Sequence, residues 1–156
     1  SAECAADLSV AASIPERYIS SSEQRMDFYR RIARIRSEEE ADDILDELID
    51  RYGEPPGMVN NLISVALLRA QAAAEGFTEI SQKGGTLLFY LFSPEFRRVS
   101  ALCSNPAYRG RLLFSAGERP YLSLRVKKGE NVLRLGQALM EDYHKTGAGG
   151  DLAGSQ

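Results

Sequence analysis

The sequence predicts an α+β fold in which a helical half precedes a strand-rich half. Between residues 20 and 75, apolar side chains recur at helical spacing in three segments joined by very short connections. After Gly76, β-branched, aromatic and apolar runs alternate with Gly and Pro turns. We therefore expect an N-terminal strand, three helices, and antiparallel hairpins with helices packed on a small antiparallel or mixed sheet of about four to five strands.

The first elements are predicted from alternation and from capping signals. Leu8, Val10 and Ala12 alternate with Asp7, Ser9 and Ala11, which predicts a short half-buried strand ended by Pro15. Several serines then offer helix N-caps, and Ser20 with Glu23 fits a capping box. We expect a helix from there to about Arg36. Its buried side is predicted to consist of Met26, Phe28, Tyr29, Ile32 and Ala33.

The next segment, Ser37 to Pro56, carries both start and stop signals for a helix. Ser37 and Glu40 form a second capping box, Gly53 stands at the C-terminal cap position, and the following prolines prevent continuation. One stripe should face a core, because apolar residues recur at helical spacing. These residues are Ala41, Ile44, Leu45, Leu48, Ile49 and Tyr52.

A third helix is expected from Pro56 to Glu75, followed by a hairpin. The helix has a broad apolar face and should be the most buried of the three. That face comprises Val59, Leu62, Ile63, Ala66, Leu67, Ala70 and Ala73. A strand then begins at Phe77, turns at residues 83–85 and returns through residues 86–92.

The remaining elements are a helix, a second hairpin and a last helix. Ser93–Pro94 is typical of a helix start, and Asn105–Pro106 should end that helix after Phe96, Val99, Leu102 and Cys103 have faced inward. Strands are expected over residues 111–115 and 121–126. Asn131 can cap the last helix, whose predicted apolar stripe is Val132, Leu135, Leu139 and Tyr143.

We expect residues 1–146 to form a single regulatory domain, with a helical part over 20–75 and a strand-rich part over 77–145. The length of 156 residues fits one domain with a sizeable core. Residues 147–156 contain four glycines and are expected to form a flexible tail. The chain begins with Ser rather than Met, which suggests a piece of a longer protein.

Composition is that of an ordinary soluble, cytoplasmic protein. Hydrophobic residues make up 44% and charged residues 26% of the chain, and no apolar run approaches the roughly 20 residues that a membrane-spanning helix needs. The net charge of -3 argues against a dedicated nucleic-acid-binding domain. Cys4 and Cys103 lack the paired spacing of a zinc site, and two buried free thiols are favoured over a disulfide.

Two charged faces attract attention. Asp43, Asp46, Glu47 and Asp50 follow the spacing i, i+3, i+4, i+7 on the outer side of the second helix, as either a solvated face or a docking surface. The first helix carries several arginines that could bind phosphates or could neutralise the acidic helix through ion pairs, and ion pairs are the favoured interpretation. These arginines are Arg25, Arg30, Arg31, Arg34 and Arg36.

No catalytic, cofactor or metal site is predicted. His144, the one histidine, stands in the last helical turn, where it more often complements the helix dipole than acts as a base. No nucleotide-binding, hydrolase or paired-cysteine motif is present, so the residues themselves indicate no convincing active site. A binding or regulatory module is favoured. A nucleic-acid-binding accessory module, an enzyme fragment completed by missing chain, and a homodimerisation domain remain alternatives.

Several stretches carry a family resemblance. The pieces IPERYI, QRMDFYRRIARI, the Ser-capped helix ending in ELIDRYG-x-PP, LLRAQAAAEG and KGG resemble the C-terminal domain of bacterial transcription-repair coupling factor, Mfd. The similarity is densest over residues 14–85 and becomes loose beyond Tyr90.

The resemblance implies a regulatory role in transcription-coupled DNA repair. In this family the DNA translocase motor and the module that binds RNA polymerase lie elsewhere in a longer chain. The C-terminal domain packs on the protein's own UvrB-like module and hides the surface that recruits UvrA. The isolated domain should therefore be a monomer without cofactor, membrane or nucleic-acid partner.

The resemblance also assigns roles to the acidic face. Glu47 and Asp50 match acidic positions of the family's ELID motif and stand on one side of a helix. We expect these two to accept hydrogen bonds from arginines of the UvrB-like module. Asp43 and Asp46 should lie at the rim, where charges steer more than they bind.

Overall fold

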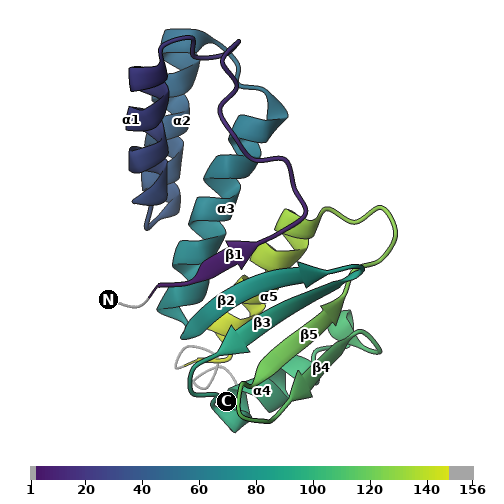
Figure 1. Ribbon diagram of the computed structural model, residues 1–156. Helices are drawn as coiled ribbons and strands as arrows, with labels where there is room; N and C mark the ends of the chain where they lie inside the picture. The colour runs from purple at the N-terminus through teal and green to yellow at the C-terminus, as the bar shows by residue number, and fades with distance from the viewer. Residues whose placement is uncertain (1–2, 148–156) are drawn as a thin grey trace. The chain divides into compact units, whose positions relative to one another are not determined.

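The computed structural model describes residues 3–147 and confirms the α+β class (Figure 1). The chain divides into two compact units, which are described separately below. We call residues 9–71 the helical unit, and residues 3–8 together with 72–147 the sheet unit. The expected organisation as one regulatory domain stays a prediction. The expected flexible tail lies outside the described residues, apart from Gly147.

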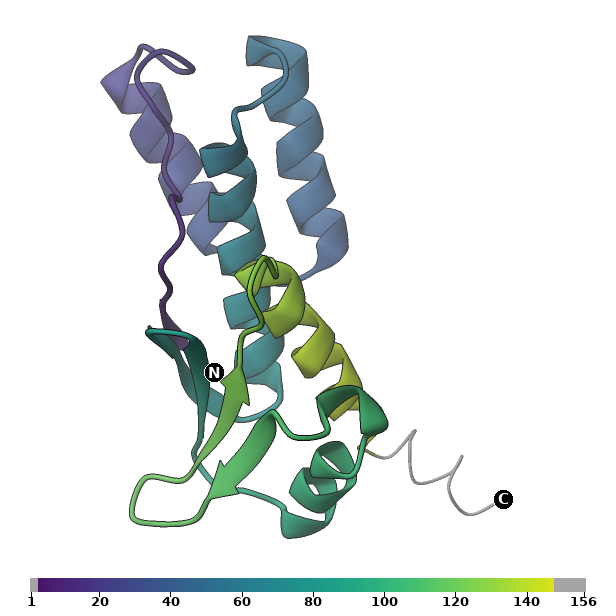
Figure 2. The ribbon, with the colours of Figure 1, turned by 90° about the vertical axis from the view of Figure 1, so that its right-hand side faces the viewer.

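Helices account for most of the helical unit. α1 spans Ser22–Ala33, α2 spans Glu38–Tyr52, and α3 spans Gly57–Ala74, with its last residues in the sheet unit. Figures 1 and 2 show that α1, α2 and the first part of α3 run alongside one another. Their shared apolar core contains Ile14, Ile19, Phe28, Ile32, Ile35, Ala41, Ile44, Leu48, Val59, Ile63 and Ala66.

The bounds of α1 differ from the prediction at both ends. The N-cap is Ser21, whose hydroxyl accepts from the Gln24 N–H, so the predicted capping box at Ser20 is wrong. The helix ends at Ala33 rather than Arg36, because the next two N–H groups bond three residues back and tighten the chain into a turn. Ile35 is thereby buried, whereas the predicted core residue Met26 is 48% exposed and Ala33 is exposed.

The predicted N-terminal strand is present, but its predicted position at residues 7–12 is wrong. The N-terminal strand β1 spans Ala5–Asp7, and the alternating stretch that follows has no regular structure. Its backbone is bonded to α3 instead: the Ser13 N–H donates to the Met58 carbonyl at 3.1 Å, and the Asn61 amide donates to the Ala11 carbonyl at 2.9 Å. Alternation fits such a half-buried segment as well as it fits a strand.

α2 has the expected caps. The Ser37 hydroxyl accepts from the Glu40 N–H at 3.2 Å, while the Glu40 carboxylate accepts from the Arg36 N–H at 2.6 Å, one residue earlier than a standard capping box requires. Gly53 closes the helix at φ 84°, a backbone conformation that favours glycine. The apolar stripe faces the core as predicted, with Ala41, Ile44 and Leu48 buried.

The sheet unit contains a mixed five-stranded sheet in the order β1-β2-β3-β5-β4. The later strands are β2 Phe77–Lys83, β3 Thr86–Leu91, β4 Leu112–Ser115 and β5 Tyr121–Arg125, close to the predicted ranges. β1 pairs parallel with β2, and the other pairs are antiparallel. Lys83 pairs with Thr86, so the predicted hairpin turn is confirmed, with Gly84 at φ 59°.

Two helices, α4 Phe96–Cys103 and α5 Val132–Lys145, lie on one side of the sheet (Figures 1 and 2). The strand residues that alternate toward that side are buried, among them Leu87, Phe89, Leu122 and Leu124. This layer of apolar side chains is the core of the sheet unit. Among the described residues of this unit, no helix lies on the opposite face of the sheet.

α4 and α5 differ from the prediction in where α4 begins and in which residues are buried. The first hydrogen bond of α4 runs from Val99 to the Glu95 carbonyl, so the helix begins after Pro94 and Phe96 is left 65% exposed. After α4, Asn105 caps the short 3-10 helix η1 at Pro106–Tyr108. In α5 the Asn131 cap is confirmed, but the buried stripe is shifted from the one predicted. It consists of Leu133, Gly136, Leu139, Met140 and Tyr143.

Candidate docking surface

The acidic face of α2, defined by Asp43, Asp46, Glu47 and Asp50, lies opposite the apolar stripe of that helix. Because the stripe is buried, the side chains of Asp43, Asp46 and Asp50 are exposed to solvent. Glu47 is half-buried, because it lies on the side of α2 that faces α1. Within the described residues 3–147, the three aspartates make no side-chain hydrogen bond or ion pair. They are therefore available to a partner.

Glu47 differs from its neighbours because it is bonded to two arginines of the same unit. Arg31 of α1 donates Nη1 to Oε2 at 2.8 Å and Nη2 to Oε1 at 2.7 Å, which makes a bidentate pair. Arg51, one turn along α2, donates Nη1 to Oε2 at 3.0 Å. The hydrogen bonds from Arg31 are the main reason that the pKa of Glu47 falls from 4.5 to about 2, with Arg51 adding to the effect.

An aromatic ring supports this ion-pair cluster. The guanidinium carbons of Arg31 and Arg51 lie 4.8 Å and 5.4 Å from the centroid of the buried Phe28 ring. The Tyr52 ring meets Phe28 edge-on, with centroids 6.0 Å apart. Cation–π contacts of this kind hold the two arginines in place beside the carboxylate.

The structure therefore separates the four predicted docking residues into two kinds. Asp43, Asp46 and Asp50 are exposed carboxylates, whereas Glu47 is already an acceptor within its own unit. The prediction that arginines of the first helix pair with the acidic helix is confirmed for Arg31. Arg25 instead donates to the carbonyls of Ile19 and Ser20, ahead of its own helix.

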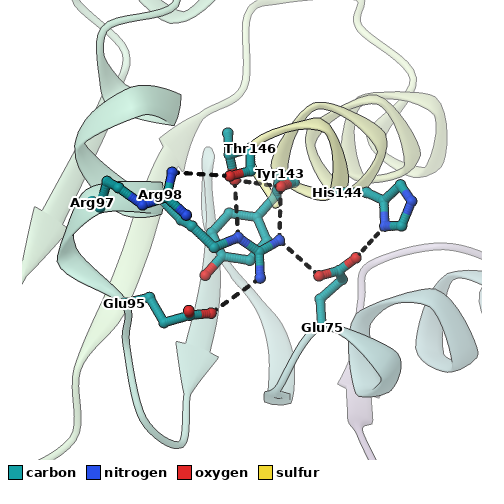
Figure 3. Close-up of polar contacts among 7 residues, drawn as sticks. All are labelled: Glu75, Glu95, Arg97, Arg98, Tyr143, His144 and Thr146. Carbon is teal, nitrogen blue, oxygen red and sulfur yellow. Dashed lines mark hydrogen bonds and ion pairs between the residues drawn. The ribbon is translucent and has the colours of Figure 1, made fainter. Parts of the chain in front are cut away.

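A second polar cluster lies in the sheet unit and was not predicted (Figure 3). Its centre is Arg98 of α4, only 8% exposed. Its Nη2 donates to Glu75 Oε2 at 2.8 Å and to the Tyr143 carbonyl at 2.9 Å, while Nη1 donates to Glu95 at 3.2 Å and Nε to the Thr146 hydroxyl at 3.1 Å. The guanidinium also stacks 4.1 Å from the centroid of the Tyr143 ring.

Arg98 has two roles in this cluster: it balances the buried charge of Glu75, and it donates to a backbone carbonyl in the last turn of α5. Burial by itself would raise the pKa of Glu75, but hydrogen bonds from Arg98 and His144 outweigh it and lower that pKa. His144 stands in the last turn of α5, as predicted, and its Nδ1 also lies 2.5 Å from Glu75 Oε1, a contact that was not predicted. It is Arg98 that binds a carbonyl of the last turn of α5. The cluster joins α4, α5 and Glu75, and its chemistry is structural.

No group of three or more His, Cys, Asp or Glu residues between 3 and 147 is arranged to hold a metal ion. Cys4 is buried and Cys103 half-buried, both as thiols, and burial raises the pKa of the Cys103 thiol. Among the same residues, no helix has the length and apolar character needed to cross a membrane.

Comparisons with known proteins place this geometry in a family. The TRCF domain family matches residues 8–101, a range that contains α1, α2 and the acidic face. The transcription-repair-coupling factor of Mycobacterium bovis is 40% identical over 75 residues, which cover 48% of this chain and 6% of that protein. The one from Escherichia coli K12 is 35% identical over 85 residues, or 53% of this chain and 7% of that protein.

A solved structure agrees with the fold. The crystal structure titled as the C-terminal domain of transcription-repair coupling factor aligns with a TM-score of 0.78, covering 94% of this chain and 96% of that one at 18% identity. These matches define an α+β domain of the kind found in transcription-repair-coupling factors. The chain belongs to the TRCF domain family, as the sequence resemblance to transcription-repair coupling factor predicted. It spans 6–7% of the length of the two relatives described above.

Proposed function

We propose that this chain is a regulatory, autoinhibitory domain of a transcription-repair coupling factor. It packs on the UvrB-like module of its own parent protein and masks the surface that binds UvrA. The parent protein works in the cytoplasm, engages RNA polymerase and DNA, and carries the ATP-dependent translocase in another part of its chain. The domain itself performs no catalysis and acts as a monomer.

The observation that carries this proposal is the acidic face of α2. Three carboxylates with no partner among residues 3–147 lie beside a fourth on one helix, within the range that matches the family. Carboxylates held in this way on a rigid helix suit an arginine-bearing protein surface, because charge-assisted hydrogen bonds to guanidinium groups are strong and directional. A surface that recruits UvrA through arginines would supply the complementary charge.

Within the face, Glu47 and Asp50 are proposed as the central contacts, with Asp43 and Asp46 at the rim. Glu47 and Asp50 are three residues apart and therefore point to the same side of α2. Removing one partner of a desolvated pair should cost about 2–5 kcal/mol of interdomain affinity. Removing an exposed rim charge should cost well under about 1 kcal/mol.

The test compares UvrA binding by full-length parent protein carrying Asp50→Ala, or Glu47→Ala with Asp50→Ala, against wild type. We expect both variants to bind UvrA more tightly, because the masked surface is released. Glu118→Ala with Glu141→Ala, which removes two exposed carboxylates of the sheet unit, is the matched control. If UvrA binding stays at the wild-type level in variants that melt like the wild type, the acidic face does not hold the domain on the UvrB-like module.

A nucleic-acid-binding role for α1 is the second candidate, favoured by the exposed Arg30 and by the exposed Arg34 at the C-cap of this helix. It predicts that the isolated chain shifts DNA in a gel at low salt and loses that affinity steeply as salt rises. Arg31 and Arg25 are already engaged within the helical unit, which reduces the charge available to phosphates. The gel shift distinguishes this candidate from the autoinhibitory docking function.

A further inference from the structure

Glu47 is the one member of the acidic face that enters docking already bonded to arginines. We propose that Arg31 and Arg51 act as internal competitors for the Glu47 carboxylate, so that docking proceeds by exchange of arginine partners. This inference rests on the proposed docking function and adds a device that sets its strength. A partner's arginine can form a bidentate pair with Glu47 only when Arg31 or Arg51 releases its hydrogen bond to Oε2.

The argument begins with the acceptor capacity of the carboxylate. An ionised carboxylate offers about four lone-pair positions on its two oxygens. Oε2 accepts from both Arg31 and Arg51, and Oε1 accepts from Arg31. About one position on Oε1 therefore remains for an incoming donor. A guanidinium from a partner can make a single hydrogen bond there, but the stronger bidentate pair also needs Oε2, which requires Arg31 or Arg51 to release that oxygen.

The exchange is physically accessible because the pair is only half-buried. The side chains of Arg31 and Glu47 are each 35% exposed, so a displaced guanidinium passes into water rather than into an apolar interior. It also keeps its contact with the Phe28 ring, whose centroid is 4.8 Å from the guanidinium carbon of Arg31. Partly exposed ion pairs of this kind contribute little free energy, so the competition should weaken docking by about two- to fivefold.

Asp50 has no such competitor within residues 3–147. It can therefore accept a partner's arginine without any prior rearrangement, whereas Glu47 can form a bidentate pair with a partner only after exchange. The acidic face thus combines Asp50, which can bind a partner directly, with Glu47, for which Arg31 and Arg51 compete with the partner. This arrangement suits an autoinhibitory contact that must also open.

The experiment measures the dissociation constant between this 156-residue chain and the separately expressed UvrB-like module of the same parent protein, by titration calorimetry. Arg31→Met removes the bidentate donor and keeps an apolar stem. Arg30→Met removes one exposed positive charge from the neighbouring position of α1 and is the matched control. We expect Arg31→Met to bind about two- to fivefold more tightly than Arg30→Met, and Arg51→Met to shift affinity in the same direction.

A Glu47→Gln background supplies the decisive comparison, because the difference between the Arg31 and Arg30 variants should vanish there. Carboxyl titration followed by NMR gives an independent readout: Arg31→Met should raise the pKa of Glu47 from about 2 toward its ordinary value. Equal affinities for Arg31→Met and Arg30→Met, or weaker binding by Arg31→Met, would overturn the exchange.

The two proposals fail in different ways. If Asp50→Asn leaves the affinity for the UvrB-like module unchanged, the docking function itself is wrong. If Asp50→Asn weakens binding while the Arg31 and Arg30 variants remain equal, docking stands and the competition is wrong.

Discussion

Arg98 is a buried cation whose charge is balanced by Glu75 and whose donors close the end of α5. Arg98→Met would leave Glu75, 13% exposed, without its main counter-charge. Breaking such a pair from one side is costly, so we expect the free energy of unfolding to fall by about 3–5 kcal/mol. Urea denaturation followed by circular dichroism measures the loss.

Its neighbour Arg97 provides the control for that prediction. Arg97 is exposed and donates to the Thr146 carbonyl at 3.4 Å, so Arg97→Met should cost under about 1 kcal/mol. Adding Glu75→Gln to Arg98→Met should restore part of the loss, because the orphaned charge is removed. Similar losses for the Arg97 and Arg98 variants would contradict the role given to the Arg98 cluster.

Glu47 should make stability depend on pH in the acid range. Its pKa is lowered from 4.5 to about 2, chiefly by Arg31, so its ionised form stabilises the folded state. That contribution is fully present above pH 4.5 and is lost as the pH falls toward 2. Because the pair is half-exposed, we expect at most about 1 kcal/mol.

The measurement compares wild type with Glu47→Gln by urea denaturation at pH 7 and pH 3. The wild type should be more stable at pH 7, and the difference should shrink at pH 3. Asp46→Asn removes an exposed carboxylate of the same helix and controls for net charge. A difference between wild type and Glu47→Gln that is unchanged by pH would rule out this linkage.

At the scale of the element, the N-terminus of α1 distinguishes two serines that the sequence alone does not. Ser21 accepts from the Gln24 N–H, whereas Ser20 lies one residue outside the cap. Ser21→Ala should therefore reduce the free energy of unfolding by about 1 kcal/mol, and Ser20→Ala should change it by a few tenths at most. Thermal melts of the two variants side by side test this, and a larger effect at Ser20 would refute the assigned cap.

Most elements could be predicted because their signals are local. The caps at Ser37 and Asn131, the turn at Gly84 and the apolar and aromatic run of β3 each depend on residues a few positions apart. The failures occur where local patterns have two physical meanings. In α5 apolar residues form two overlapping stripes, and only packing on the sheet decided which one is buried.

At the scale of the whole molecule, charge is unevenly divided between the two units. By sequence, residues 9–71 hold eight Lys or Arg against twelve Asp or Glu, a net charge of -4, whereas the rest of the chain holds eleven against ten, or +1. The helical unit should therefore attract a basic partner, and the attraction should be screened by salt.

We expect Asp43→Asn with Asp46→Asn to slow association with the UvrB-like module at low salt and to leave dissociation nearly unchanged, because rim charges act on encounter. Association and dissociation rates measured by surface plasmon resonance at 50 and 300 mM salt test this. Faster dissociation in the double variant would show that these aspartates lie within the contact and not at its rim.

The sequence by itself determined the α+β class, the order of elements, the hairpins and an acidic face on α2, because each follows from periodicity and capping within a short stretch. Only the tertiary structure decided which carboxylates of that face are engaged. Arg31 and Glu47 are sixteen positions apart, and Glu75 and His144 sixty-nine, so no local pattern links them. Packing brings such residues together, and it is packing that left Asp50 exposed and bonded Glu47 to Arg31.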